Sequence, residues 1–390
     1  MRIQQSTEVA DILRLAISHE KFRASKPQWK IINAILNCRT AALGGHLYQC
    51  TKCGHGEPRY NSCRNRHCPK CQGADIAKWL HARSTELLPV PYFHTVFTVP
   101  HQFNIVFLQN KKIMFNLLSK AINETLKTAT KSRYGGTIGF FGVLHTWGQL
   151  MEFHPHVHCV IPGAILKENG EIVLTDKNYF LPDRLLNKLF RAIFIKHLER
   201  AYSKRKLRFY GKARHLQQKK EFQKLKNSAV KTDWIVYSKK PFSSPQIVLN
   251  YLSQYTHRVA INNSRIRSIQ NGVVTFSYKD YRRKGKKKTQ KLKVTEFARR
   301  FLLHALPKHF VRIRHFGFMA NRCRKEAVQK INKALEAVPI LLQTETREES
   351  PCPKCNSGVL RKLAKLDEIS LPYKTPNAII PHRAQSPPAF

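Results

Sequence analysis

Six of the ten cysteines in this 390-residue chain lie between Cys38 and Cys71, and they constrain its folding most strongly. The segment contains two Cys-x2-Cys pairs, Cys50/Cys53 and Cys68/Cys71, separated by fourteen residues. Each pair can offer two thiolates to one ion, and two pairs complete the tetrahedron that zinc prefers. Clustered cysteines in a chain without a secretory segment favour metal binding over disulfides. We therefore predict one structural zinc bound by these two pairs.

The same segment holds enough further ligands for a second zinc site. The second predicted set, interleaved with the first, comprises Cys38, His46, Cys63 and His67. A closed site with four protein ligands has no open position, so we expect both ions to shape the domain and not to perform chemistry. A third pair, Cys352/Cys355, is half a site. It either recruits a histidine or Cys323, or it carries no metal.

The charge balance indicates the class of partner. The chain has 69 Lys and Arg against 24 Asp and Glu, a net charge of +45. Such a surplus repels itself unless a polyanion neutralises it, and binding to nucleic acid releases counterions. We predict DNA binding, with Arg64 and Arg66 presented by the loop between the predicted zinc ligands. A membrane surface is the weaker alternative. No run of 18 apolar residues occurs, so a membrane-spanning helix is not expected.

The apolar pattern predicts an α+β chain in three consecutive parts. Residues 1–90 are expected to form a helical zinc-binding domain. Residues 91–320 alternate strands and helices, with about five strands and a basic insertion near 180–232. Residues 321–390 add a helix, the Cys352/Cys355 pair and a Pro-rich tail expected to be disordered. Without a secretory segment, a cytoplasmic, nucleoid-associated location is expected.

Residues 91–320 contain two shorter patterns. The run Arg282 to Lys288 is expected in a loop beyond a hairpin at Asn271-Gly272. His154, His156 and His158 occupy alternate positions of a predicted strand, so their imidazoles project from one face and can bind one divalent cation. Solvent-facing histidines without a role are the alternative, and three at a regular spacing, preceded by another at 145, argue against it.

Tyr251 and Tyr255 lie four residues apart in a predicted helix, so both hydroxyls can address one site. Such a pair is more often packed in a core. The histidine metal site and the strong positive charge of the chain favour the interpretation that these two tyrosines are nucleophiles. A cation favours the phenolate and polarises a DNA phosphodiester.

Three segments, in this order, resemble transposases of the IS91 type: CRTAALGGHLYQCTKCGH…YNSCRNRHCPKCQ, HPHVH and YLSQYTHRVAI. These are rolling-circle insertion-sequence transposases of the two-tyrosine class, called HUH after a His–hydrophobic–His motif. The resemblance spans about Cys38 to Phe318. It implies an antiparallel sheet of about five strands flanked by helices, which acts as a single-strand endonuclease and strand transferase.

The resemblance also implies roles for single residues. His156 and His158 would hold Mg²⁺ or Mn²⁺, and Tyr255 or Tyr251 would attack the scissile phosphate to give a 5′-phosphotyrosine and a free 3′-OH. Related initiators place a third metal ligand upstream of the first histidine, where Gln149 lies here on the preceding predicted strand. Its rivals are Glu152, His154 and His257. Arg258 could bind the phosphate or cap the end of the helix.

Two alternatives stay open. A plasmid-type replication initiator would use the same chemistry, but the cysteine segment argues against it. A non-catalytic, zinc-dependent DNA-binding regulator explains the charge and the cysteines but leaves HPHVH and the tyrosine pair unexplained. The sequence contains no G-x4-G-K-[ST] loop, so a helicase, if one takes part, would come from the host.

Overall fold

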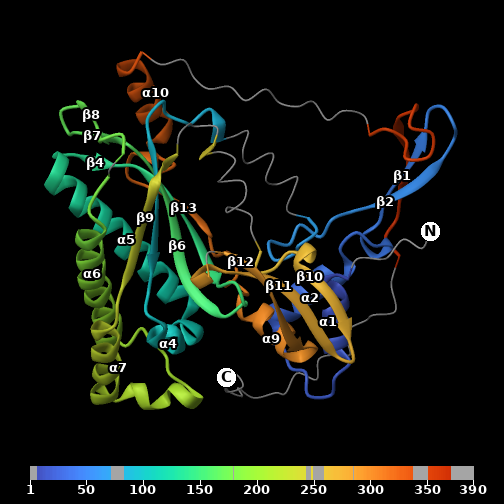
Figure 1. Ribbon diagram of the computed structural model, residues 1–390, viewed down its shortest axis with the longest axis horizontal. Helices are drawn as coiled ribbons and strands as arrows, with labels where there is room; N and C mark the ends of the chain where they lie inside the picture. The colour runs from blue at the N-terminus through green and yellow to red at the C-terminus, as the bar shows by residue number, and fades with distance from the viewer. Residues whose placement is uncertain are drawn as a thin grey trace. The chain divides into compact units, whose positions relative to one another are not determined.

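The computed structural model describes residues 7–71, 83–178, 180–242, 247–248, 259–283, 285–336 and 350–369 (Figure 1). The chain divides into two compact units, neither of which is continuous in sequence. Unit 1 comprises Met1–Lys78, His257–Ala305 and Leu342–Gln385; unit 2 comprises Trp79–Thr256, Leu306–Leu341 and Ser386–Phe390. These units differ from the three consecutive parts expected from the sequence, because segments distant in the chain pair with each other.

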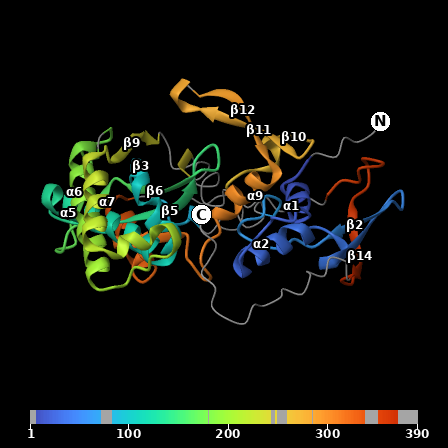
Figure 2. The same cartoon turned by 90° about the horizontal axis from the view of Figure 1, so that it is seen from below.

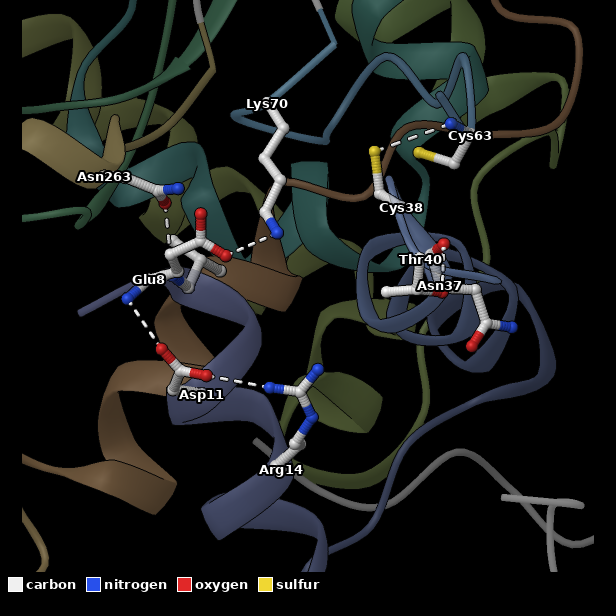
Figure 3. A network of polar contacts seen from close by, with 10 residues as sticks. Glu8, Asp11, Arg14, Asn37, Cys38, Thr40, Cys63, Lys70 and Asn263 are labelled. Carbon is white, nitrogen blue, oxygen red and sulfur yellow. Dashed lines mark hydrogen bonds and ion pairs between the residues drawn. The ribbon is translucent and has the colours of Figure 1, made fainter. Parts of the chain in front are cut away.

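The described residues of unit 1 form three α-helices and two small sheets. The helices are α1 (Val9–Ile17), α2 (Lys26–Asn37) and α9 (Val294–Leu303). A helical repeat of apolar residues buries one side of α1, which packs against both α2 and α9. A capping box formed by Glu8 and Asp11 begins α1, and the Val9 N–H donates to the Asn263 side chain at 3.1 Å (Figure 3). The segment that follows residue 257 thus belongs to the N-terminal helices.

Pairing between the two ends of the chain forms the first sheet of unit 1, in the order β14-β1-β2. Its strands are β1 (Gly45–Cys50), β2 (Gly56–Tyr60) and β14 (Leu360–Leu366). Strand β14 runs antiparallel to β1, with Cys50 opposite Leu360. The C-terminal segment is therefore part of the same unit as the N-terminal cysteines.

The second sheet of unit 1 has the order β10-β11-β12. Its strands are β10 (Ile266–Gln270), β11 (Val273–Asp280) and β12 (Lys286–Lys293). The hairpin expected at Asn271-Gly272 is present, with a positive φ at both residues. The prediction of a loop from Arg282 to Lys288 is wrong for its last three residues. Lys286 to Lys288 are the first residues of β12 and pair with β11.

Unit 2 is built on a five-stranded antiparallel sheet in the order β13-β5-β6-β3-β9, which confirms the α+β class and the five-stranded sheet expected from the sequence. The strands are β3 (Tyr92–Thr98), β5 (Phe140–Trp147), β6 (Phe153–Pro162), β9 (Ile235–Phe242) and β13 (Ile313–Phe316). A smaller sheet, β4-β7-β8, contains Thr137–Ile138, Ala164–Leu166 and Ile172–Leu174.

Helices cover one face of the five-stranded sheet (Figure 2). They are α4 (Asn104–Gln109), α5 (Lys111–Tyr134), α6 (Asp183–Ser203) and α7 (Lys219–Lys231), and α10 (Arg324–Ala334) follows β13. Phe97, Leu144 and Val157 point from the strands into the core that these helices complete. The basic stretch near 180–232 forms α6 and α7, and Phe190 and Phe222 bury its apolar side in that core, so it is an integral layer and not an added loop.

Several expected features lie outside the described residues. They are Tyr251, Tyr255, His257, Arg258, the Pro-rich tail after 369 and most of a helix expected at 74–88. Among the described helices, none combines the length and the apolar character needed to cross a bilayer.

Candidate metal centres and active site

The first group of four cysteines in unit 1 lies between α2 and the loop that follows β2. Cys38 directly follows α2, and Cys63, Cys68 and Cys71 come from the loop. Their four sulfurs lie within 4.8 Å of one another, with Cys63 and Cys71 Sγ 3.5 Å apart. The Cys63 N–H points at Cys38 Sγ from 3.5 Å, and Lys70 of the same loop pairs with Glu8 at the start of α1 (Figure 3).

The second group joins the two ends of the chain. Cys50 and Cys53 lie in the turn after β1, and Cys352 and Cys355 lie in the turn before β14. The Cys50–Cys355 and Cys53–Cys352 sulfurs are each 3.7 Å apart. A Cβ on Gly358 would meet Cys50 Sγ at 2.4 Å, so the backbone of the second turn packs directly on the sulfur group.

These two groups correct the zinc partition predicted from the sequence. Cys50 and Cys53 do not share a group with Cys68 and Cys71, and neither His46 nor His67 belongs to one. The reason is the β1–β14 pairing, which brings Cys352 and Cys355 to the first cysteine pair. The later cysteines then complete a set with Cys38 and Cys63.

The donor chemistry of both groups fits zinc. All eight cysteines are free thiols, and sulfurs bound to one tetrahedral zinc lie about 3.8 Å apart, given a Zn–S bond of about 2.3 Å. Hydrogen bonds from the thiols of Cys63 and Cys68 lower the pKa of Cys38, and the same bonds raise the pKa values of those two donors. One thiolate suppresses ionisation of its neighbours, so a dication is needed to hold four together.

In unit 2, three histidines converge on the sheet face opposite the helices. His145 on β5 lies opposite His156 on β6, and His158 follows two residues later on the same face. Their nearest ring nitrogens lie within 4.8 Å of one another, and the Nε2 atoms of His156 and His158 are 3.1 Å apart. His145 is buried and stacks on Trp147 with ring centroids 4.7 Å apart.

Neighbouring groups fix the nitrogens that these rings present. His156 Nδ1 lies 2.7 Å from the carbonyl oxygen of His154, which can only accept, so the proton of the neutral ring sits on Nδ1 and Nε2 keeps its lone pair. His94 Nε2 lies 2.9 Å from His158 Nδ1 and can accept a hydrogen bond from its N–H. In that tautomer two Nε2 lone pairs face each other at 3.1 Å, an arrangement suited to a cation between them.

Burial keeps the rings of His158 and His94 neutral. It lowers the pKa of His158 well below its usual range, with the positive potential of His145 as the next cause. It lowers the pKa of His94 to about 3, and Lys239 contributes in the same direction. Neutral imidazole is the form that binds metal, so the site is prepared for a cation.

The sequence-predicted ligands are only partly brought together here. His156 and His158 are paired as expected, and His145 takes the third position within the group. Gln149 lies in the turn after β5 and not on the strand, because β5 ends at Trp147. Its role as a ligand stays a prediction. In the same turn the Leu150 N–H donates to Glu152 at 2.9 Å.

Sequence reasoning missed His94 and did not assign His145 as the third ligand. Both stand in strands that were correctly expected, but their contacts depend on the pairing of β3, β5 and β6. The sequence did contain a signal for His94. Along its strand, Tyr92, His94 and Val96 alternate with Phe93 and Phe97. Because Phe93 and Phe97 point into the core, His94 must lie on the opposite face.

The histidine face continues across the sheet to the edge strand β9. Two cross-strand rows are formed by His145–His156–Thr98–Ile235 and by Val143–His158–Val96–Tyr237. Ile235 and Tyr237 are 56% and 53% exposed, so the rows end on an accessible surface. Lys239, opposite His94, adds a cation to this face.

In unit 1, Arg64 and Arg66 are exposed on the loop between Cys63 and Cys68, as the sequence predicted. Arg64 has a φ of 50°, in the left-handed region, so the tight loop turns outward at this residue. Their contact with DNA stays a prediction.

The chain is similar in sequence to known transposases. The sequence profile of a transposase zinc-binding domain matches residues 13–99, and a profile described as "Putative transposase" matches residues 139–327. "Putative transposase y4qJ" of Sinorhizobium fredii is 41% identical over 387 residues, covering 94% of this chain and 97% of that protein. The transposase for insertion sequence element IS801 of Pseudomonas savastanoi pv. phaseolicola is 28% identical over 308 residues, covering 78% and 73%. No solved structure matches the chain significantly.

The fold and the comparisons together define a transposase with an N-terminal zinc-binding domain. The chain belongs to the IS91 family of insertion-sequence transposases, as its motifs indicated.

Proposed function

We propose that this transposase nicks and rejoins single-stranded DNA at insertion-sequence ends through a 5′-phosphotyrosine intermediate, and so carries out rolling-circle transposition. The observation that carries the proposal is the convergence of His145, His156 and His158 on the accessible face of the central sheet. Three nitrogens hold a cation while leaving positions for water and phosphate oxygens.

A divalent cation at this site would act as a Lewis acid toward the scissile phosphate. Imidazole donors suit Mn²⁺ and later transition ions better than Mg²⁺, which prefers oxygen ligands. Of the two catalytic ions expected, Mn²⁺ therefore fits the donor set better. Gln149, if its side chain turns to the site, would add an oxygen and widen the preference toward Mg²⁺.

The described residues would prepare the site for this cation. The carbonyl of His154 and the ring of His94 would hold His156 and His158 in the tautomers that carry the lone pair on Nε2. Lys239 raises the positive potential of the same face and would attract the DNA backbone. Tyr237, exposed beside it, offers a ring on which an unpaired base can stack.

The nucleophiles proposed from the sequence are Tyr255 and Tyr251. The phenol loses its proton and its oxygen bonds to the phosphorus, while the bond to the 3′ oxygen breaks and that oxygen takes up a proton. One phosphodiester replaces another, so the reverse attack by a 3′-OH rejoins the strand without ATP. With two tyrosines, one can retain a strand while the other cleaves the next. Arg258 would bind the phosphate nearby.

In unit 1 we propose one structural zinc in each cysteine group. The ions would hold the loop of Arg64 and Arg66, and the turns beside β1 and β14, in fixed shapes. This unit would bind DNA at the element ends, since exposed cations on a rigid loop position a phosphate backbone. We also propose a host helicase as a partner of the transposase.

The decisive experiment is covalent capture. The full-length chain is incubated with Mn²⁺ and a single-stranded oligonucleotide from the element end that is labelled at its 3′ terminus. A labelled protein band resistant to denaturation is expected. It should be strongly reduced by Tyr255→Phe, and lost when Tyr251→Phe is added.

A matched control is Tyr237→Phe, which removes another phenol from the histidine face but should leave the adduct intact. Failure of the folded native chain to form an adduct would contradict the proposal, as would an adduct that survives both tyrosine substitutions. A metal titration separates the remaining alternative, because a non-catalytic regulator should bind zinc tightly and show no weaker, exchangeable Mn²⁺ site.

A further inference from the structure

Strands β11 and β12 of unit 1 extend beyond the end of β10, their neighbour in the same sheet. Strand β10 pairs only with Val273–Phe276 of β11, whereas β12 pairs with β11 over its whole length, from Val273 opposite Lys293 to Asp280 opposite Lys286. Beyond Phe276, β11 and β12 pair with each other alone among the described strands and form a two-stranded ribbon (Figure 2). We refer to the whole β11–β12 pair, residues 273–293, as the basic ribbon.

The ribbon concentrates positive charge on one face. Residues 273–293 include nine Lys and Arg and a single acid, Asp280, which pairs with Lys288 at 2.8 Å. Because side chains alternate, one face presents Lys279, Lys287, Lys291 and Lys293 together with Thr275, Ser277 and Thr289. The lysines of this set and Thr289 are exposed.

Folding does not require lysine at these positions. The register is set by the opposite face, where Val274 and Phe276 are fully buried and Phe276 contacts Phe297 of α9. On the exposed face, Lys287, Lys291 and Lys293 recur along one strand, and their like charges repel one another. A polyanionic partner removes that cost, since its phosphates neutralise the ammonium groups.

We propose that the basic ribbon docks into the major groove of duplex DNA. The major groove admits a two-stranded β-ribbon. Alternate residues of β12 lie about 7 Å apart, close to two base-pair steps of about 3.4 Å each. The lysines can thus follow the phosphates while the threonine hydroxyls between them reach base edges.

The composition of the face favours a duplex over a single strand. Its side chains include no aromatic ring; Tyr281, 68% exposed, lies at the tip and not on the face. Single-strand sites rely on rings that stack with unpaired bases. An RNA duplex fits poorly, because its major groove is too narrow for side chains to read.

The test compares two triple variants of the full-length chain in fluorescence anisotropy with a labelled DNA duplex, without added Mn²⁺. The ribbon variant is Lys287→Gln/Lys291→Gln/Lys293→Gln. The control removes the same charge from exposed positions of α5, as Lys112→Gln/Lys127→Gln/Lys131→Gln. Circular dichroism and zinc content verify that both variants are folded.

We expect the ribbon variant to lose about a hundredfold in duplex affinity at 0.1 M salt, and its log K against log salt slope to fall by about 2.7, or 0.9 per lost phosphate contact. The control should change much less. Equal losses in the two variants would overturn the proposal, and so would an equally large loss on single-stranded DNA or on duplex RNA.

This inference is separable from the proposed chemistry. The ribbon variant should still form the covalent adduct on a short single strand, because the histidines are unchanged. Absence of adduct in every variant would sink the nicking proposal and leave the duplex result standing. Intact adduct with unchanged duplex affinity would sink only the ribbon.

Discussion

The cysteine groups of unit 1 and the histidine group of unit 2 are both suited to metal, but they are assembled in opposite ways. Each cysteine group gathers four sulfurs from separate turns and loops, which in the second group, that of Cys50 and Cys352, lie far apart in sequence. The histidines come from β5 and β6, adjacent strands of one sheet. Strand pairing brings both the histidines and the turns of Cys50 and Cys352 together, but four thiolates in one group repel one another unless a cation binds them, whereas neutral imidazoles do not.

This difference separates structural from chemical use of a metal. Four protein ligands close the coordination shell, and the ion then contributes to folding. Three ligands on an accessible face leave room for substrate. Loss of metal should therefore disorder the first kind of site and leave the second folded but inactive.

The largest effect is expected from Cys352→Ser. The bound zinc should fall from two equivalents to one, and the β14-β1-β2 sheet should lose its protection from proteolysis, because structural zinc contributes about 10 kcal/mol or more in small domains. Zinc content by mass spectrometry and limited proteolysis measure both. Cys323→Ser, which lies outside both groups, is the control. Retention of two zinc ions in the Cys352 variant would refute the structural partition, and loss of zinc in His46→Ala would support the one first predicted.

The next effect is on activity. His156→Ala should reduce nicking about a thousandfold, or about 4 kcal/mol of transition-state stabilisation, with an unchanged melting temperature. His154→Ala is the matched control: it lies on the same strand and face, and its polar contact with His156 is made by the backbone carbonyl, which remains, so that only the ring packing at 5.1 Å is lost. An equal loss in both variants would mean that the face, and not the metal group, is needed.

The histidine site was the more predictable from sequence, and the reason is geometric. Alternation along a strand is local, so HPHVH already placed His156 and His158 on one face. The α+β class with about five strands followed from the apolar pattern, whereas the antiparallel arrangement was implied by the resemblance to IS91-type transposases. What the spacing could not supply was which strands pair, and therefore that His145 and His94 would meet His158.

The cysteine partition failed because its decisive contact is non-local. Cys50 meets Cys355 only when β14 pairs with β1, across about three hundred residues. Proximity in sequence favoured Cys68 and Cys71 as partners instead. Ligand count was also misleading, since His46 and His67 made two complete sets possible without the C-terminal pair.

A smaller effect is expected on stability as a function of pH. The folded pKa of His94 is about 3, below the roughly 6.5 of an unfolded histidine. The unfolded state therefore binds more protons between these values, and the free energy of unfolding falls as the pH drops through that window. His94→Gln keeps an acceptor for His158 but should reduce the slope by about 1.4 kcal/mol per pH unit. Urea denaturation at pH 5.5 and pH 4.5, both inside that window, gives both slopes; parallel curves would show that His94 takes up its proton in the folded state.

The smallest effect concerns the accessible edge of the histidine face, which has no counterpart in the closed cysteine groups. Tyr237 ends the cross-strand row that contains His158, and a base stacked on it would lie beside the metal group. Tyr237→Ala should weaken binding of a single-stranded oligonucleotide about tenfold, since stacking contributes about 1–3 kcal/mol per base, while Tyr237→Phe should bind normally. Tyr281→Ala removes an even more exposed ring from the basic ribbon and should leave single-strand affinity unchanged. If Tyr237→Ala binds as well as the native chain, the single-stranded DNA does not cross this edge. The exposed part of the histidine face would then contact only the scissile phosphate.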